Sequence, residues 1–175
     1  TEEYATGYLP PVFIHEFQHM ISFNQHVLEA SSSFVEDTWL NEGLSHFAEE
    51  LGGRLIPDGL CQPLFDNCES QFIGGNIDNA YKYLENPEAS FLIEPGSSQG
   101  DLAERGANWL FVRWLTDHFA GGQPLGHDFT RQLVQTSSRG SANVEAVTGE
   151  PFEELVAHWQ LANYVEDLPD FTPLD

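Results

Sequence analysis

Two histidines stand four residues apart in the segment His15-Glu16-Phe17-Gln18-His19, which has the pattern H-E-x-x-H. On a helix, residues i and i+4 lie one above the other, so both imidazoles could bind one zinc ion at about 2.0–2.1 Å. Glu16 would project roughly 60° around the helix from His19, beside such a metal rather than on it. From there its carboxylate could accept a proton from a zinc-bound water, whose pKa the metal lowers to about 7. The spacing therefore indicates metal-assisted hydrolysis.

A catalytic zinc ion requires a third protein ligand and an open fourth position. Glu42 is the best candidate, because it lies on the polar face of a helix expected over residues 38–51. His46 and Glu49 share this face, and His46 could support the site or bind the metal itself. The connecting segment is long enough to bring His19 and Glu42 together. The sequence therefore predicts a site built from two helices.

Both helices that would carry these residues have an apolar face. The first is expected over residues 12–23, after Pro10 and Pro11, with its apolar residues on the side opposite His15 and His19. These residues are Phe13, Ile14, Phe17, Met20 and Ile21, and those of the second helix are Leu40, Leu44, Phe47 and Leu51. We therefore expect each helix to pack its apolar stripe against a core.

The rest of the sequence predicts further helices joined by irregular segments. Residues 53–100 are rich in proline and glycine, so we expect a long loop there, with one short helix over residues 79–84. Helical periodicity resumes in the segments 102–119, 128–136 and 142–147 and in a final helix after Pro151. Turns are expected at Gly74-Gly75 and Gly121-Gly122. Strand signals are weak, so we predict a mainly α fold with little or no sheet, in one domain over residues 1–175.

The chain is strongly acidic, with 28 acidic residues against six basic ones and a formal net charge of −22. Such a surface would repel nucleic acids and anionic membranes, so neither is an expected partner. Hydrophobic residues make up 41% of the chain, which excludes a disordered protein. No apolar run is long enough to span a membrane, and the acidic start at Thr1 does not resemble a secretory signal. We expect any such signal to have been removed from a protein that works outside the cell.

Two cysteines, Cys61 and Cys68, could form a short-loop disulfide, which an oxidising compartment would favour. Two buried free thiols are the alternative. Three aspartates, Asp58, Asp66 and Asp78, could contribute to a calcium site, although they lack the spacing of an EF-hand. Zinc is therefore the main expected cofactor, with calcium as a further candidate.

Four segments carry a resemblance to known peptidases: HEFQHMISF, WLNEGLSHFAEELGG, RGANWLFVRWL and NVEAVTGEPFEELVAHW. An H-E-x-x-H helix followed by an N-E-x-x-S helix resembles the gluzincin superfamily of zinc peptidases. More closely, the segments resemble the hyicolysin-type metallopeptidases of secreted bacterial proteins. The resemblance implies zinc ligands at His15, His19 and Glu42, and a general base and acid at Glu16. It also implies a helical zincin fold and a secreted bacterial zinc endopeptidase that hydrolyses protein or peptide substrates.

The chain departs from this family near the first histidine. Thermolysin-like members have an aspartate four residues after the ligand glutamate, and it orients the first histidine. Here His46 occupies that position, so Glu49 or Ser45 could take over the contact with His15. Gluzincins also place a β-sheet upstream, whereas only 14 residues precede His15. We therefore expect the chain to be the C-terminal helical part of a longer or processed protein.

The group that would stabilise the oxyanion is a further point of difference. Related gluzincins often carry a tyrosine well beyond the ligand glutamate. Arg105 is the nearest cationic residue to that position and could act electrostatically, with Tyr81 and Tyr83 as competitors. Alternatively, Arg105 could simply pair with Glu104 or Asp101. These departures support a second hypothesis, a peptidase-derived helical module that binds a metal or a partner without turnover.

Overall fold

The fold is described by a computed structural model for residues 7–57, 68–96 and 100–165. These ranges contain no strand and seven α-helices: α2 (Leu9–Phe23), α3 (Thr38–Leu55), α4 (Cys68–Glu85), α5 (Leu102–Phe119), α6 (His127–Val134), α7 (Gly140–Thr148) and α8 (Phe152–Val165). The shorter elements are a π-helix, Asn24–Glu29, and two 3₁₀ turns, Pro87–Ala89 and Pro124–Gly126. The prediction of a mainly α fold is confirmed for this part of the chain, and none of its helices is long and apolar enough to cross a membrane.

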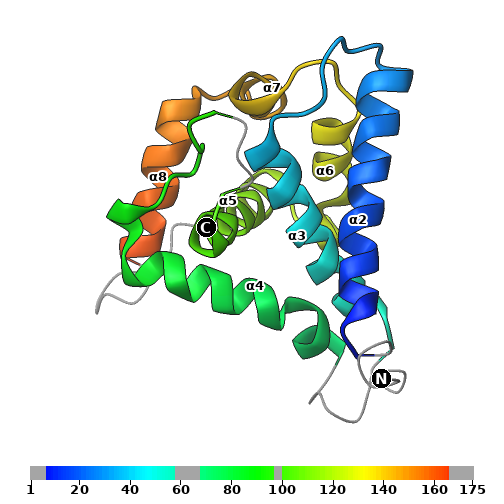
Figure 1. Ribbon diagram of the computed structural model, residues 1–175. Coiled ribbons are helices and arrows are strands. Elements are labelled where there is room, and N and C mark those ends of the chain that lie inside the picture. The colour runs from blue at the N-terminus through cyan, green and yellow to red at the C-terminus, as the bar shows by residue number, and fades with distance from the viewer. Residues whose placement is uncertain (1–6, 58–67, 97–99, 166–175) are drawn as a thin grey trace.

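Helices α3 and α5 lie at the centre of the fold, and the other helices surround them (Figure 1). Helix α2 packs along α3, α4 crosses both central helices, and α8 lies on the side of the molecule away from α2. The core side chains include Leu40, Leu44, Phe47, Ala107, Phe111, Val112, Leu115, Leu133, Leu155 and Trp159. This core fixes α3, and with it the residues that α3 presents to α2.

Two glycines let neighbouring helices approach each other closely. A Cβ atom at Gly43 would lie 2.7 Å from the backbone oxygen of Asn108 on α5. A Cβ atom at Gly106 would lie 2.3 Å from the backbone of Asn79 on α4. Both distances are far below van der Waals contact, so only glycine fits at these crossings. Since Gly43 directly follows Glu42, the crossing of α3 and α5 also fixes that glutamate.

Local sequence signals explain where several helices begin and end. Pro10 and Pro11 occupy the first turn of α2, where no intrahelical N–H is needed. Helix α5 begins with a capping box, in which Asp101 and Glu104 each accept a hydrogen bond from the other's backbone N–H. Gly149 ends α7 with a φ of 79°. The predicted bounds of α5 are confirmed, and α6, α7 and α8 lie close to theirs.

Helix α4 occupies a segment for which the sequence predicts a loop, so that prediction is wrong. Its 18 residues run through Gly74-Gly75, where the sequence predicts a turn. Each glycine costs a helix roughly 1 kcal/mol relative to alanine. Burial of apolar side chains against α3 and α5 offsets this cost, because tertiary packing stabilises helices more than propensity does. The buried side chains are Phe72, Ile73, Ala80 and Tyr83. The other pair does form a turn, with positive φ at Gly121 and Gly122.

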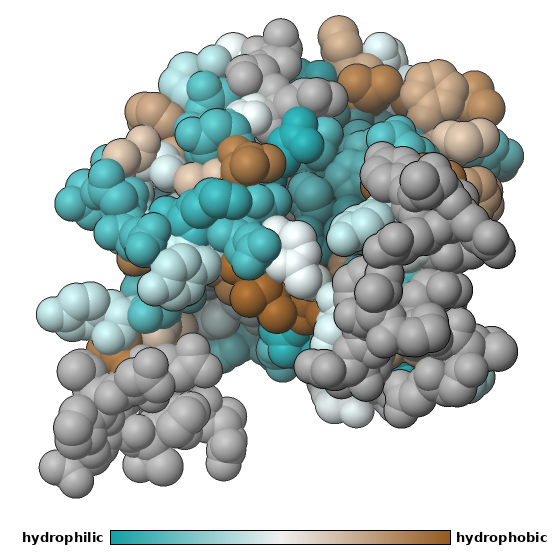
Figure 2. All heavy atoms as spheres, turned by 60° about the horizontal axis from the view of Figure 1, so that its bottom comes forward, coloured by the Kyte–Doolittle hydropathy of each residue, from teal (hydrophilic) through white to brown (hydrophobic). Residues whose placement is uncertain are grey.

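Helix α2 turns its polar side toward α3, and the prediction that its apolar stripe packs in the core is wrong. Phe13 is 68% exposed, Phe17 49% and Met20 66%, whereas Gln18 and Ser22 are buried. Figure 2 shows hydrophobic side chains gathered at the edge on which α2 lies in Figure 1. The physical reason is that α3 presents buried polar side chains to α2, and these need hydrogen-bond partners. The polar face of α2 supplies those partners.

Some predictions fall on residues outside the described ranges. Cys61, Asp58 and Asp66 belong to this group. Cys68 begins α4, is fully buried and is disulfide-bonded. Asp78 lies exposed on α4.

Candidate metal centre

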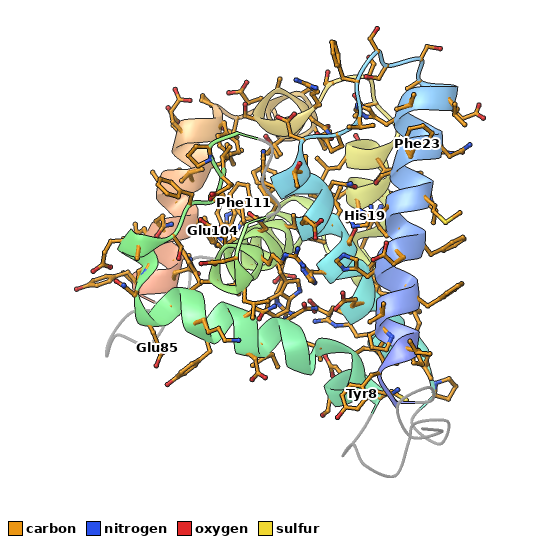
Figure 3. All side chains as sticks on the ribbon, viewed as in Figure 1. Tyr8, His19, Phe23, Glu85, Glu104 and Phe111 are labelled. Carbon is orange, nitrogen blue, oxygen red and sulfur yellow. The ribbon has the colours of Figure 1, made fainter. Side chains whose placement is uncertain are left out.

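His15, His19 and Glu42, the three predicted zinc ligands, lie together between α2 and α3. The Nε2 atoms of His15 and His19 are 3.2 Å apart. Oε2 of Glu42 lies 3.5 Å from Nε2 of His15, and Oε1 of Glu42 lies 3.7 Å from Nε2 of His19. Figure 3 shows His19 on the side of α2 that faces α3. The two helices thus bring two imidazole nitrogens and one carboxylate to a single point.

These separations fit a tetrahedral zinc site. Ligand atoms placed tetrahedrally at about 2.0–2.1 Å from a zinc ion are about 3.3–3.4 Å from one another. The observed separations of 3.2, 3.5 and 3.7 Å lie around that value. Oε2 of Glu42 is also buried and has no hydrogen-bond partner, so it is an acceptor that a cation would satisfy. The residues present therefore fit a bound metal ion.

Glu42 is ionised in spite of its burial. The side chain is almost wholly inaccessible on α3. Burial raises the pKa of its carboxyl group, but His15, Arg105 and His19 together outweigh that effect and lower the pKa below its ordinary value of 4.5. At neutral pH this position therefore offers a carboxylate, the form that binds metal ions.

A second glutamate from α3 holds His15. Nδ1 of His15 donates a 2.7 Å hydrogen bond to Oε1 of Glu49, and Asn76 on α4 donates one of 3.0 Å to Oε2 of Glu49. This chain of bonds directs Nε2 of His15 toward Glu42, as outer carboxylates do for metal-bound histidines. Burial lowers the pKa of His15, but Glu42 and Glu49 outweigh it and raise the pKa to about 9. A metal ion that binds Nε2 must therefore displace a proton.

A hydroxyl group from α3 holds His19. Ser45 Oγ lies 2.6 Å from Oε1 of Gln18 and 3.0 Å from Nδ1 of His19. The hydroxyl proton is used on a carbonyl oxygen, either that of Gln18 or the backbone oxygen of Asn41 at 2.9 Å, so Oγ accepts from Nδ1 of His19 and the lone pair of His19 is on Nε2. Glu49, rather than Ser45, contacts His15, and Ser45 supports the other histidine.

His46 is a second candidate ligand near the same point. One ligand atom each from His15, Glu42 and His46 lie within 4.8 Å of one another. Nε2 of His46 is buried without a hydrogen-bond partner, and its Nδ1 lies 3.2 Å from Oε1 of Glu49. Separations of up to 4.8 Å are wider than the tetrahedral value of about 3.3–3.4 Å. His19 therefore completes the ligand set better than His46.

The predicted general base, Glu16, lies on the solvent-exposed side of α2. It adjoins His15 in sequence and precedes His19 by three residues, so the two side chains are neighbours on the helix surface. Its side chain is thus open to solvent on the helix that carries both histidines.

The residues predicted to stabilise an oxyanion lie in three different environments. Arg105 is half-buried on α5 and close enough to Glu42 to lower the pKa of that carboxyl group. Tyr81 is exposed on α4. Tyr83 is buried, stacks on Trp159 and accepts a hydrogen bond from α8, so it belongs to the core. Of the three, only Arg105 has a described interaction with the ligand cluster.

Sequence reasoning misses two residues of this centre. Asn76 donates to Glu49 and to the backbone oxygen of His46, but it lies on a helix that the sequence does not predict. Gln18 stands inside the H-E-x-x-H segment, at a position that the motif leaves unspecified. The sequence signal for it is that Gln18 lies on the same side of the helix as the two histidines.

No protein-family model matches the chain, and neither a curated protein nor a solved structure matches it. The resemblance to hyicolysin-type metallopeptidases therefore stays a prediction from the motifs, and the function has to be inferred from the geometry of the site.

Proposed function

We propose that this chain is a zinc-dependent endopeptidase of the gluzincin type that acts on protein or peptide substrates. The observation that carries the proposal is the 3.2–3.7 Å spacing among the ligand atoms of His15, His19 and Glu42. The solvent-exposed Glu16 beside these ligands favours a catalytic site. A purely structural zinc site is usually built with cysteines and would leave Glu16 without a role.

Each residue has a separate role in this proposal. His15, His19 and Glu42 would hold the ion. Zinc, when bound, polarises the scissile carbonyl and lowers the pKa of water to about 7. The Glu16 carboxylate accepts the proton of the attacking water and then donates it to the leaving amine nitrogen. Arg105 supplies positive charge from α5 toward the negative charge that develops on the carbonyl oxygen.

The acidic surface and the cysteine chemistry support a location outside the cell. A net charge of −22 keeps the chain soluble in a salt-containing medium, where charge repulsion is screened. Cys68 is disulfide-bonded, which is typical of oxidising compartments. We propose a secreted bacterial peptidase on these grounds and on the resemblance of the motifs.

Hydrolysis of unfolded casein tests the proposed activity. Chelation should abolish hydrolysis by the wild type, and added zinc should restore it. Glu16→Gln should keep near-normal zinc affinity while hydrolysis falls by at least about 10²-fold, the scale of lost general base catalysis. Glu29→Gln, an exposed glutamate just beyond α2, is the matched control and should hydrolyse casein like the wild type.

Two outcomes would contradict these roles. If Glu16→Gln lost zinc while Glu42→Gln kept zinc and stayed active, the assignment of base and ligand would be reversed. If the wild type bound zinc and did not hydrolyse casein, the alternative of a metal-binding module without turnover would be supported.

A further inference from the structure

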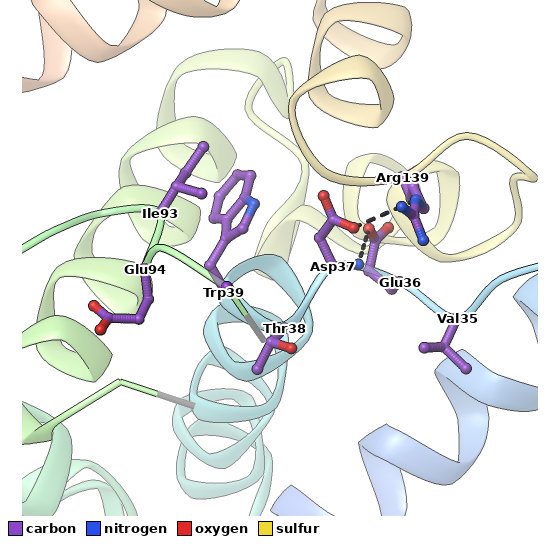
Figure 4. A pocket seen from close by; sticks show the side chains of 9 residues that line it. Val35, Glu36, Asp37, Thr38, Trp39, Ile93, Glu94 and Arg139 are labelled. Atoms are coloured by element: carbon purple, nitrogen blue, oxygen red, sulfur yellow. Dashed lines mark hydrogen bonds and ion pairs between the residues drawn. The ribbon is translucent and has the colours of Figure 1, made fainter. Parts of the chain in front are cut away.

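A cavity lies at the N-terminal end of α3 (Figure 4). It has a volume of about 310 Å³ and is lined by residues 35–39 and by Ile93, Glu94, Gly96 and Arg139. Trp39, in its wall, precedes the proposed ligand Glu42 by three positions. The side chains of residues three apart on a helix are neighbours, with about 5–6 Å between their Cβ atoms. One wall residue of the cavity therefore lies within one helical turn of the proposed ligand Glu42.

Two buried polar atoms in the wall of this cavity have no hydrogen-bond partner. Trp39 is 5% exposed, and its Nε1 donor is unpaired. Figure 4 shows that this nitrogen is on the side of the ring that faces Asp37 and Arg139. Oε2 of Glu94 is an unpaired buried acceptor. Since buried polar groups are nearly always hydrogen-bonded, an unpaired donor and an unpaired acceptor in one cavity indicate a ligand that supplies both partners.

The other charged groups of the cavity, Glu36, Asp37 and Arg139, serve the fold. Glu36 accepts hydrogen bonds of 2.6 Å from the backbone N–H of Gly140 and 2.7 Å from Nδ2 of Asn143, and so fixes the start of α7. Asp37 forms an ion pair of 3.4 Å with Arg139. These two carboxyl groups are already paired, which leaves Nε1 of Trp39 and Oε2 of Glu94 to contact a ligand.

The charge of the cavity favours a cation. Three carboxyl groups, those of Glu36, Asp37 and Glu94, face a single arginine. A hydrogen bond with the Glu104 side chain raises the pKa of the Glu94 carboxyl group, and burial and repulsion by the negative charges of Glu104 and Asp101 raise it further. A positive group next to Glu94 would offset that repulsion, and the indole ring of Trp39 attracts cations by its quadrupole.

We propose that this cavity is a substrate subsite that takes a peptide residue with a basic side chain, lysine or arginine. The main-chain carbonyl of that residue accepts a hydrogen bond from Nε1 of Trp39, and its cationic side chain pairs with Glu94. This inference rests on the proposed peptidase activity, because it places the subsite beside the bond that the metal centre would cleave. A chain of net charge −22 also attracts such basic peptides over longer distances.

A set of short fluorogenic peptides tests the subsite. The peptides share one sequence, and a single position carries lysine, glutamine or glutamate, with that position moved along the peptide. For the wild type, kcat/KM should be at least about tenfold higher with lysine than with glutamine at one position, as expected for a charge-assisted contact. Glu94→Gln should bring this ratio close to one. Glu85→Gln, an exposed glutamate at the end of α4 that Figure 3 shows pointing away from the fold, should keep the wild-type ratio.

The second variant is Trp39→Phe, which keeps an aromatic ring against Phe111 and Phe152 and removes the Nε1 donor. It should lower kcat/KM for the lysine and the glutamine peptide by a similar factor. The reason is that the contact between Nε1 and the peptide carbonyl does not depend on the charge of the peptide side chain. Glu94→Gln, in contrast, should remove only the preference for the lysine peptide. Equal rates for all three peptides at every position, or a lysine preference that survives Glu94→Gln, would overturn the subsite.

Equilibrium binding separates failure of the subsite from failure of the peptidase proposal. Fluorescence anisotropy of the labelled lysine and glutamine peptides is measured with chelator-treated protein, so that no cleavage occurs. Tighter binding of the lysine peptide that is lost in Glu94→Gln supports the subsite, even if no peptide is hydrolysed when zinc is added. Hydrolysis without any lysine preference in rate or binding overturns the subsite and leaves the proposed activity standing.

Discussion

Glu42 and Glu50 lie on the same helix, α3, and both are almost completely buried, but their surroundings differ. Glu50 has a full set of partners. Arg54 and Arg113 pair with its Oε1, and Nε1 of Trp109 donates a 3.0 Å hydrogen bond to its Oε2. The charge of Glu50 is thus neutralised within the protein.

Glu42 has no such set. His15 and His19 lie 3.5 and 3.7 Å from its carboxylate oxygens, Arg105 lowers its pKa, and its Oε2 has no hydrogen-bond partner. A buried carboxylate is costly unless it is paired and hydrogen-bonded. The contrast indicates that Glu50 stabilises the fold as it stands, whereas Glu42 is placed to receive a cation.

The largest effect is expected from Glu50→Ala. It should lower the free energy of unfolding by about 3 kcal/mol, the lower end of the range for breaking a buried pair. The lower end applies because the side chains of Arg54 and Arg113 are 32% and 33% exposed and are partly solvated. Urea denaturation with chelator present measures this change. Glu85→Ala, an exposed control, should stay within about 0.5 kcal/mol of the wild type, and a similarly small change for Glu50→Ala would contradict its structural role.

The second prediction concerns stabilisation by zinc. At a free zinc concentration a hundredfold above Kd, the unfolding free energy of the wild type should rise by about 2.7 kcal/mol. Glu42→Gln should lose most of this gain, since a neutral amide oxygen is a poorer ligand than a carboxylate. Glu50→Ala should keep it. Denaturation curves with and without zinc measure the gain for each protein, and an equal gain in Glu42→Gln and the wild type would remove the contrast between the two glutamates.

A smaller effect on zinc binding is expected from Glu49, which contacts the ligand His15 rather than the metal. Glu49→Gln should weaken zinc binding by about 10–100-fold, the usual effect of losing an outer carboxylate partner of a metal-bound histidine. The reason is that Glu49 accepts the 2.7 Å hydrogen bond that orients His15. Competition with a chromophoric chelator measures the affinity, and unchanged affinity would show that this hydrogen bond does not orient the ligand.

The smallest effect is expected from His46→Asn. The ligand atoms of His15, Glu42 and His46 are farther apart than tetrahedral coordination allows. Zinc affinity should therefore fall by less than about tenfold, which is less than the loss expected when an outer partner such as Glu49 is removed. The same chelator competition applies. Complete loss of zinc from this variant would replace His19 with His46 in the ligand set.

The sequence is most informative where spacing alone decides the chemistry. The interval from His15 to His19 and the place of Glu42 on its helix predict three residues that the fold does bring together. The predicted bounds of α5 also hold, because Asp101 and Glu104 form a capping box that is local in sequence. Such signals need no knowledge of distant contacts.

The rest depends on tertiary contacts that no local pattern contains. Helix α4 forms through Gly74-Gly75 because α3 and α5 bury its apolar side, and Asn76 reaches Glu49 only as a result. Helix α2 turns its apolar stripe outward because its polar face pairs with Ser45 and Glu49. Hydrophobic periodicity predicts that a helix has two faces, but it does not predict which face a polar partner will cover.

Zinc content is the most direct test of the central claim that His15, His19 and Glu42 bind one metal ion. Wild type, His19→Ala and Glu42→Gln are dialysed against the same zinc buffer, and the metal is counted per folded chain by elemental mass spectrometry. We predict about one zinc ion per wild-type chain and a large loss in both variants. Full retention of zinc in His19→Ala, or a wild type that binds none, would contradict the account.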